Sequence, residues 1–458
     1  MNVLPDCYRT CRELKETFWL QTGPKIPALQ DIISAHFGYD CGELTLLDEG
    51  AYARAYKASL STGKKLVVRV VLPVRDGLKT EAEVATMDFV RAETNIPIPR
   101  VHLFCSSRNN PIGAEWIVMD FVPGERFIDC WDELSLEARR RTVEDLAGIM
   151  SSLYSITSTH CASLISFPSL TNSQRARRFG DHPSLPPTVE GRTSLCPATF
   201  GPVNDLCFVE RLFPAPFQRC GPFTSEREYL EAVAYANIIE TDRRIVKHMR
   251  WPHEKVFEVY DRVRAEYAKT VESGLVGETA GLPRFHFSHG DLSDTNILLD
   301  KTTGCITGII DWEAAGFRPA WLAAGKAGML EDHSHDEEDG DVDGDDENND
   351  DCYCLHRTFF EDPFPVAGSE SQEDFLLRSH FLVQLAERDL GLAVHHRYGT
   401  ELRAIFAALC EVVPASVEAW IEKYRERRWD VIARGKFPFD VENWIRERIA
   451  LWQRYEIV

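Results

Sequence analysis

Short apolar runs, each bounded by Gly, Pro or polar residues, dominate the first third of the chain. They predict five strands, at Leu44–Leu47, Ala55–Leu60, Lys65–Leu72, Val101–Cys105 and Trp116–Val122. Between the third and fourth strands, apolar residues recur at helical spacing and predict a helix over 79–91. This part of the chain is therefore expected to be rich in sheet.

Helical periodicity prevails in the rest of the chain and near its start. One or two helices are expected within 1–39, and residues 161–224, rich in Pro, Ser, Gly and Arg, are expected to be irregular. The other expected helices are Ser135–Ile156, which Ser135 would cap, then 226–250, 256–273, 318–330, 372–390, 400–412, 417–426 and 441–455. The pattern predicts an α+β protein with a sheet-rich part and a mainly helical part.

The segment 287–313 holds the strongest candidates for chemistry. A polar loop with Asp291 and Asn296 runs into one apolar strand, and after a turn the chain returns as a second apolar strand that ends at Asp311. Such a hairpin would hold two carboxylates and an amide carbonyl at its open end, which are oxygen ligands suited to Mg²⁺. Phosphoryl transfer needs such a metal and one carboxylate that accepts the acceptor's proton. An ordinary turn rich in Asp and Asn is the alternative.

The same segment resembles the catalytic core of the aminoglycoside phosphotransferase and choline-kinase-like family, relatives of the protein kinases, in its fungal-type members. The family pattern is His-Gly-Asp, four residues, Asn, and then Ile-Asp-Trp a short hairpin later. The resemblance implies that Asp291 is the catalytic base, that Asn296 and Asp311 bind metal, and that His289 orients the loop. It also implies a two-lobed protein-kinase-like α+β fold, with a small antiparallel-sheet lobe and a large mainly helical lobe.

One long cation interrupts the third apolar strand. Arg69 lies within Leu66–Leu72, and a buried charge needs a partner. Kinases pair a strand lysine with a helix glutamate to hold the phosphates, so the resemblance implies that Arg69 pairs with Glu83, with Glu81 in reserve. Arginine stays charged and binds phosphate oxygens in a fork, which keeps nucleotide binding feasible. A structural ion pair without a nucleotide role is the alternative.

Two further positions follow from the resemblance. The turn at Gly50 stands where a kinase-like fold places its phosphate loop, but Gly50 is its only glycine, so a plain hairpin turn remains an alternative. Asp120 and Val122 end the fifth strand, where the family has the hinge whose backbone groups would bind the nucleotide base.

These predictions combine into a domain plan and an activity. Residues 1–41 would form a helical extension, 42–122 a nucleotide-binding small lobe, and 123–458 a catalytic large lobe with an acidic insert at 331–351. The expected activity is transfer of the γ-phosphate of ATP, or GTP, with Mg²⁺, to a hydroxyl of a small-molecule metabolite. A catalytically weak or inactive kinase-like binding protein is the alternative, because the phosphate loop is poor in glycine and Arg69 replaces lysine.

Composition narrows the classes of partner and location. Residues 331–351 hold 13 acidic residues and no Lys or Arg, and without them the formal net charge of −21 becomes −8. The insert is expected to be solvated, although 339–350 also fits part of an EF-hand pattern. No basic stripe or long apolar run is present, which predicts neither nucleic-acid binding nor a membrane span. The 13 cysteines form no paired framework, and residues 1–20 lack a secretory or import pattern, so a cytoplasmic protein is expected.

Overall fold

The computed structural model describes residues 17–50, 52–72, 77–165, 199–205, 208, 220–244, 253–270, 285–325 and 372–410. They group into two compact units. Unit 1 holds the described residues within Met1–Gly124, Ala162–Pro222 and Thr307–Gly316, and unit 2 those within Glu125–Cys161, Phe223–Ile306 and Phe317–Val458. Residues 307–316, predicted as part of the large lobe, thus group with unit 1. The acidic insert with its EF-hand-like run and the helices expected at 417–426 and 441–455 lie outside the described residues.

A five-stranded antiparallel sheet forms the centre of unit 1, with strand order β1-β2-β3-β5-β4. All five strands expected from the sequence are present, with small shifts at their ends. Their bounds are β1 Thr45–Glu49, β2 Ala53–Ser59, β3 Lys65–Val71, β4 Val101–Cys105 and β5 Glu115–Asp120.

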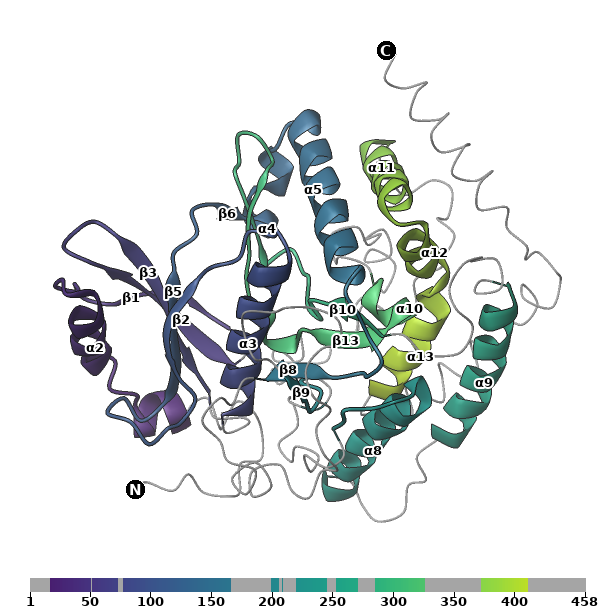
Figure 1. Cartoon of the computed structure of the whole chain (residues 1–458), viewed down its shortest axis with the longest axis horizontal. Helices are drawn as coiled ribbons and strands as arrows, with labels where there is room; N and C mark the ends of the chain where they lie inside the picture. Colours follow the sequence, from purple (N-terminus) through teal and green to yellow (C-terminus); the bar gives the residue numbers. More distant parts are fainter. Residues whose placement is uncertain are drawn as a thin grey trace, which may run out of the picture. The chain divides into compact units, whose positions relative to one another are not determined.

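The two faces of this sheet differ because side chains alternate along β3. Leu66, Val68 and Val70 are fully buried in a core that they share with helix α2 (Pro27–Phe37). Arg69 points to the opposite face, toward helix α3 (Leu78–Glu93). Figure 1 shows the two helices on either side of the sheet. The period of two along the strand therefore places the one cation of β3's apolar run against α3.

Helix α3 is anchored at its first turn by a buried carboxylate. Glu115 on β5 accepts hydrogen bonds from the Gly77 amide at 2.7 Å and from the Thr80 hydroxyl at 2.6 Å. An acidic group at a helix N-terminus satisfies N–H groups that have no partner within the helix, and it interacts well with the helix dipole. The contact therefore ties the start of α3 to strand β5.

Further short segments complete unit 1. The amide of Ile309 on β12 (Ile306–Ile309) donates to the Pro97 carbonyl at 2.8 Å, which ties β12 to the connector after α3. Then follows a 3₁₀ turn at Trp312–Ala314. Other elements are a π-helical turn Thr17–Thr22, the pair β8 (Ser163–Ile165) and β9 (Thr199–Gly201), and β13 (Gly316–Pro319), which the unit boundary crosses.

Unit 2 is mainly helical. As predicted, Ser135 caps helix α5, its hydroxyl accepting a hydrogen bond from the Ala138 amide at 3.2 Å. Helix α5 packs on α11 and α9 on α13, and Figure 1 shows these pairs side by side. The helices are α4 Phe127–Cys130, α5 Leu136–Tyr154, α8 Glu226–Arg244, α9 His253–Thr270, α10 Ala320–Ala323, α11 Gln372–Arg388, α12 Leu390–Tyr398 and α13 Thr400–Cys410, besides a 3₁₀ turn Trp131–Glu133.

Short strands of unit 2 lead into and out of the candidate loop. Strand β10 (Phe285–Ser288) pairs with β7 (Thr157–Ser158), and β11 (Ile297–Leu299) pairs with β6 (Glu125–Arg126). Phe285 and Phe287 on β10 and Ile297 and Leu299 on β11 are buried, whereas residues 290–295 of the loop between these strands are partly or fully accessible. The loop that carries Asp291 is thus held by paired strands at both ends.

Two local predictions were wrong. Arg318 lies in strand β13 rather than in a long helix, and the helix that follows covers only Ala320–Ala323 before the described residues end at 325. Pro319 precedes that helix, which fits its missing N–H and fixed φ. The second error is α12, which was not predicted. Asp389 starts it by accepting a hydrogen bond from the Leu392 amide at 2.9 Å.

The elements confirm the predicted class, α+β, with a small antiparallel-sheet unit and a mainly helical unit. Among the described residues, no helix is both long and apolar enough to cross a membrane.

Candidate active site

The loop between β10 and β11 carries the predicted catalytic base. His289 is buried, with 2% of its surface exposed, and the amide of Asp291 donates to its Nδ1 at 3.3 Å. This contact requires the neutral ring with its proton on Nε2. His289 therefore shapes the backbone that presents Asp291, which is the geometry expected of a scaffold residue.

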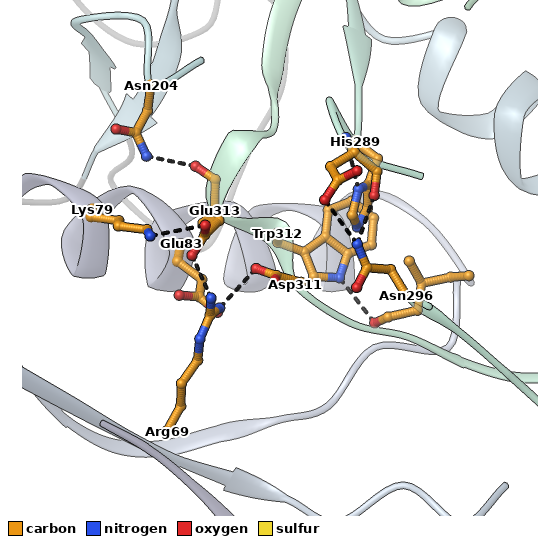
Figure 2. Close-up of polar contacts among 11 residues, drawn as sticks. Arg69, Lys79, Glu83, Asn204, His289, Asn296, Asp311, Trp312 and Glu313 are labelled. Carbon is orange, nitrogen blue, oxygen red and sulfur yellow. Dashed lines mark hydrogen bonds and ion pairs between the residues drawn. The ribbon is translucent and has the colours of Figure 1, made fainter. Parts of the chain in front are cut away.

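Asn296 fixes the other end of the same loop. Its side-chain Nδ2 donates to the Asp291 carbonyl at 2.9 Å and to the Asp291 Oδ2 at 3.1 Å. Its own amide donates to the Ser293 carbonyl at 3.1 Å. Asn296 is buried, and none of the described residues donates to its Oδ1. Figure 2 shows Asn296, with dashed lines for the hydrogen bonds that its side-chain nitrogen donates. The amide nitrogen thus orients the loop while the carbonyl oxygen keeps its lone pairs for another ligand.

Asp311 adopts a left-handed backbone conformation, with φ of 64° and ψ of 64°. It is the only non-glycine residue with positive φ in the described part of the chain. Such backbone strain costs about 1–3 kcal/mol and gathers at functional sites. The following turn is held by Trp312, which is fully buried and whose indole N–H donates to the Ile309 carbonyl at 3.0 Å. The packing of Trp312 therefore keeps Asp311 in this conformation.

Arg69 lies at the centre of a buried charge cluster in unit 1. Its NH1 group donates to Glu83 and lies 2.9 Å from Oδ1 of Asp311, and its NH2 group donates to Glu313. The predicted pair of Arg69 and Glu83 is present, whereas Glu81 instead accepts a hydrogen bond from Ser106. Figure 2 shows the three carboxylates converging on the guanidinium.

The contact of Arg69 with Asp311 is an ion pair rather than a well-directed hydrogen bond. Oδ1 of Asp311 is 2.9 Å from NH1, yet this buried oxygen has no hydrogen-bond partner, because the N–H groups do not point at it. The Asp311 side chain as a whole is 32% exposed. Asp311 therefore carries one buried oxygen facing a cation and remains accessible from solvent.

The crowding of charge shifts the pKa values in the cluster. Burial raises the pKa of Glu83 to about 7, assisted by Asp311 and Glu313 and opposed by Arg69. Burial lowers the pKa of Arg69, but Asp311, Glu83 and Glu313 outweigh it and raise this pKa well above its ordinary value. Arg69 thus remains charged, and the raised pKa means that Glu83 binds a proton more readily than an ordinary glutamate does.

Glu313 had no predicted role in this cluster, and the same holds for Lys79 and Asn204. Lys79 lies one turn before Glu83 on α3, is 1% exposed, and places Nζ 2.9 Å from Oε1 of Glu313. Asn204 donates from Nδ2 to the Glu313 carbonyl at 2.6 Å. The spacing of Lys79 and Glu83, four residues apart on one helix, was a usable signal for Lys79. Asn204 lies within 161–224, the stretch expected to be irregular, and its sequence context gave no such signal.

The turn at Gly50 and the end of β5 have local partners. The Gly50 amide donates to the Ala53 carbonyl at 2.9 Å, which closes the β1–β2 hairpin. Asp120 accepts from His102 at 2.7 Å and pairs with Lys64 at 3.2 Å; burial raises its pKa, but these contacts outweigh burial and lower it. Among the described residues, the Val122 backbone makes no hydrogen bond. Nucleotide-binding roles for Gly50, Asp120 and Val122 stay predictions.

The structure thus brings the predicted residues together in two groups. Arg69, Glu83 and Asp311 are in contact in unit 1, and Asp291 and Asn296 are in contact in unit 2. Within the described ranges, no group of three or more His, Cys, Asp or Glu side chains is arranged to hold a metal ion.

Comparison with known protein families supports the assignment by sequence. The profile of the family described as "Phosphotransferase enzyme family" matches residues 43–340, which is more than half of the chain. The chain belongs to this family. The resemblance inferred from the segment 287–313 is confirmed, and with it the predicted kinase-like fold class.

Curated relatives match parts of the chain at low identity. A subtelomeric hrmA-associated cluster protein of Aspergillus fumigatus is 25% identical over 309 residues, 62% of this chain and 60% of the relative. The altered inheritance of mitochondria protein 9 of Komagataella phaffii is 25% identical over 302 residues, 60% of this chain and 47% of the relative. The chain thus spans no more than three fifths of these relatives. The name of the second includes "mitochondrial", and a cytoplasmic location stays a prediction.

Solved structures show similarity at still lower identity. The GDP complex of an aminoglycoside 2′-phosphotransferase covers 94% of this chain and 98% of its own, with 14% identity and a TM-score of 0.40. A type I macrolide 2′-phosphotransferase covers 87% and 95%, with 12% identity and a TM-score of 0.40. Because the identities and TM-scores are this low, the family assignment rests on the sequence profile and not on these structures.

Proposed function

We propose that the protein transfers the γ-phosphate of ATP or GTP to a hydroxyl group of a small-molecule metabolite. In this proposal Asp291 accepts the hydroxyl proton, Asn296 and Asp311 hold Mg²⁺, and Arg69, kept in place by Glu83, binds nucleotide phosphates. The observation that carries the proposal is the shared NH1 group of Arg69, which contacts both Glu83 and Asp311. Membership of the phosphotransferase family supports it.

The proposed metal ligands have suitable chemistry. Asp311 offers a carboxylate with a buried oxygen that lacks a hydrogen bond, and Asn296 offers a carbonyl oxygen to which no described residue donates. Mg²⁺ prefers such hard oxygen donors and completes its shell with water and phosphate oxygens. When bound, the ion would neutralise charge on the transferring phosphoryl group. These residues therefore fit the ion that the family implies.

The proposed base is held in a way that suits proton transfer. The carboxylate of Asp291 receives one hydrogen bond from Asn296 Nδ2 at 3.1 Å, and its backbone is fixed by His289. A base must be oriented before the acceptor binds, because misplacement of reacting groups is costly in rate. His289 and Asn296 orient Asp291 in this way, and the Asp291 carboxylate is the group that would accept the proton.

Two observations favour the alternative, a catalytically weak or inactive kinase-like binding protein. Arg69 is already engaged by three carboxylates, and the Gly50 amide is already used within its hairpin. Both groups would have to share or change partners to bind phosphates. The two proposals differ in product formation, since only an enzyme releases a phosphorylated acceptor.

The test compares the parent with Asp291→Asn and, as a matched control on the same loop, Asp294→Asn. Each protein is incubated with Mg²⁺ and ATP or GTP against pooled hydroxylated metabolites, and products are found by the mass added on phosphorylation. Loss of a general base typically costs about 10²–10⁴-fold in rate. We expect Asp291→Asn to lose turnover in this range, while nucleotide binding measured by calorimetry stays close to the parent.

Three results would argue against parts of this proposal. Equal turnover in the parent and Asp291→Asn would remove Asp291 from the mechanism. Loss of nucleotide binding together with turnover would instead make Asp291 a metal ligand. Nucleotide binding by a parent that forms no product across the pool would favour the binding protein.

A further inference from the structure

Lys79 is a buried cation that the proposed mechanism does not use. It is 1% exposed, and its Nζ lies 2.9 Å from Oε1 of Glu313 and 3.9 Å from the centre of the Tyr52 ring. Nζ makes no well-directed hydrogen bond to any described residue. Burying an ammonium group is costly unless it is paired. The position of Lys79 therefore depends mainly on Glu313.

Glu313 uses its two carboxylate oxygens for two different cations. Oε2 accepts from NH2 of Arg69, and Oε1 pairs with Lys79. Its backbone carbonyl accepts from Asn204 at 2.6 Å. Figure 2 shows Glu313 between the two cations. This carboxylate thus joins strand β3, helix α3 and the turn that follows Asp311.

The orientation of Arg69 depends on this bridge. A guanidinium group is planar and presents its donors as a rigid fork. With NH1 on Glu83 and NH2 on Glu313, both branches of the fork are held. If Glu313 were lost, NH1 alone would hold the group, and it could turn about that contact. Glu313 also lies two residues after Asp311, so the same contact limits movement of the Asp311 turn.

Lys79 also balances the charge of the cluster. Three carboxylates surround Arg69, and Lys79 is the second cation in contact with them. With all three carboxylates ionised, the cluster without Lys79 would have two more negative charges than positive ones. Such an excess repels phosphate groups, and at short range in a partly buried site the repulsion is strong. Lys79 reduces this excess, and its contact with Tyr52 extends the cluster to the start of β2.

We infer that Lys79 and Glu313 form a second buried cation–carboxylate pair, which positions Arg69 and the Asp311 turn for nucleotide binding. The inference rests on the proposed function for its nucleotide. Lys79 is then a positioning residue, because it acts on the phosphate site through Glu313 and has no contact of its own with the phosphates.

The test uses four variants and one control. Lys79→Met keeps the length of the side chain without its charge, Lys79→Arg keeps the charge, and Glu313→Gln removes the shared carboxylate. The double variant Lys79→Met/Glu313→Gln measures whether the two residues act together. The control is Glu115→Gln, which alters a buried carboxylate that anchors the same helix without touching Arg69.

Two quantities are measured on each full-length protein. Amide hydrogen exchange of the segment 307–316 without nucleotide reports how firmly the Asp311 turn is held, and calorimetry gives the Kd of a non-hydrolysable ATP analogue with Mg²⁺. Groups that orient ligating residues typically contribute about 10–100-fold to affinity. We expect Lys79→Met and Glu313→Gln to speed exchange and raise the Kd in this range. Lys79→Arg should keep both quantities close to those of the parent. The Kd of the double variant should be no higher than that of the single variant with the higher Kd.

The control separates positioning from general loosening of α3. Glu115→Gln should lower the Tm but keep the exchange of 307–316 and the Kd within a few-fold of the parent. The inference fails if Lys79→Met leaves exchange and Kd unchanged, or if Glu115→Gln causes the same losses. A parent that binds no nucleotide would count against the proposed function, while the exchange data would still decide whether Lys79 holds the Asp311 turn.

Discussion

The NH1 group of Arg69 lies 2.9 Å from Oδ1 of Asp311, a residue held in the left-handed backbone region. Asn adopts this backbone conformation more readily than most residues and matches Asp in shape. Asp311→Asn therefore removes one charge with little change in structure.

The first prediction concerns this substitution. We expect Asp311→Asn to weaken binding of the Mg²⁺–nucleotide complex and to lower turnover by about 10²–10³-fold, the range typical for loss of one electrostatic group at a transition state. Stability should change by about 1 kcal/mol or less, because the side chain is partly exposed. Calorimetry at increasing Mg²⁺ concentration and a denaturant titration check both parts. Nucleotide binding with the Mg²⁺ dependence of the parent would rule out Asp311 as a metal ligand.

The second prediction contrasts two glutamates two residues apart on α3. Glu83 contacts Arg69, whereas Glu81 accepts from Ser106. Glu83→Gln should raise the Kd for nucleotide by about tenfold, because Arg69 loses one anchor. Its stability should stay within about 1 kcal/mol of the parent, since Arg69 keeps two other carboxylates. Glu81→Gln is the matched control and should keep the Kd of the parent. Equal effects of both variants on the Kd would mean that the Arg69–Glu83 pair has no special role.

The third prediction concerns a close approach at Gly304. Its φ is 71°, and a Cβ atom there would lie 2.0 Å from the Ala138 carbonyl oxygen. Gly63 has a similar φ of 85° but nothing within 4 Å of such an atom. Gly304→Ala should therefore cost about 2–5 kcal/mol of unfolding free energy, and Gly63→Ala about 1–2 kcal/mol. Urea unfolding of the two variants measures the difference. Equal losses would mean that the backbone near Ala138 moves aside at little cost.

The fourth prediction concerns pH and His395. Burial, with smaller contributions from His286, Arg264 and Arg403, lowers the pKa of His395 to about 3. The unfolded chain binds this proton near pH 6.5, so the stabilising contribution is complete above pH 6.5 and is lost as pH falls toward 3. When the pH is lowered from 7.5 to 5, this residue alone should reduce the parent's free energy of unfolding by about 2 kcal/mol.

The matching variant isolates this effect. His395→Gln can retain a hydrogen bond to the Tyr267 hydroxyl, which lies 2.6 Å from Nδ1, and it does not titrate. It should lose about 2 kcal/mol less than the parent between these pH values. The control His36→Gln, at an exposed position on α2, should follow the parent. If His395→Gln and the parent lose equal stability in urea titrations, His395 does not titrate as proposed.

Local patterns in the sequence were enough to predict much of the fold. The five strands of the sheet follow from apolar runs that end at turn residues, and the start of α5 follows from Ser135. The apolar strand around Arg69 indicated that this cation needs a partner, and the resemblance to the kinase-like family implied that the partner is Glu83. These features depend on residues close together in sequence. Asp389, by contrast, gave a capping signal for α12 that the prediction missed.

Other features of the site were decided only by tertiary structure. Arg69 and Glu313 are 244 positions apart, and no periodicity links them. Asn204 reaches Glu313 from a stretch without a regular pattern. The left-handed backbone of Asp311 accompanies the burial of Trp312. Sequence alone thus determined the family, the strands and the residue types at the site. Which carboxylates share Arg69, and that Lys79 joins them, depended on packing between distant segments, because a buried charge takes whichever partner the fold brings within reach.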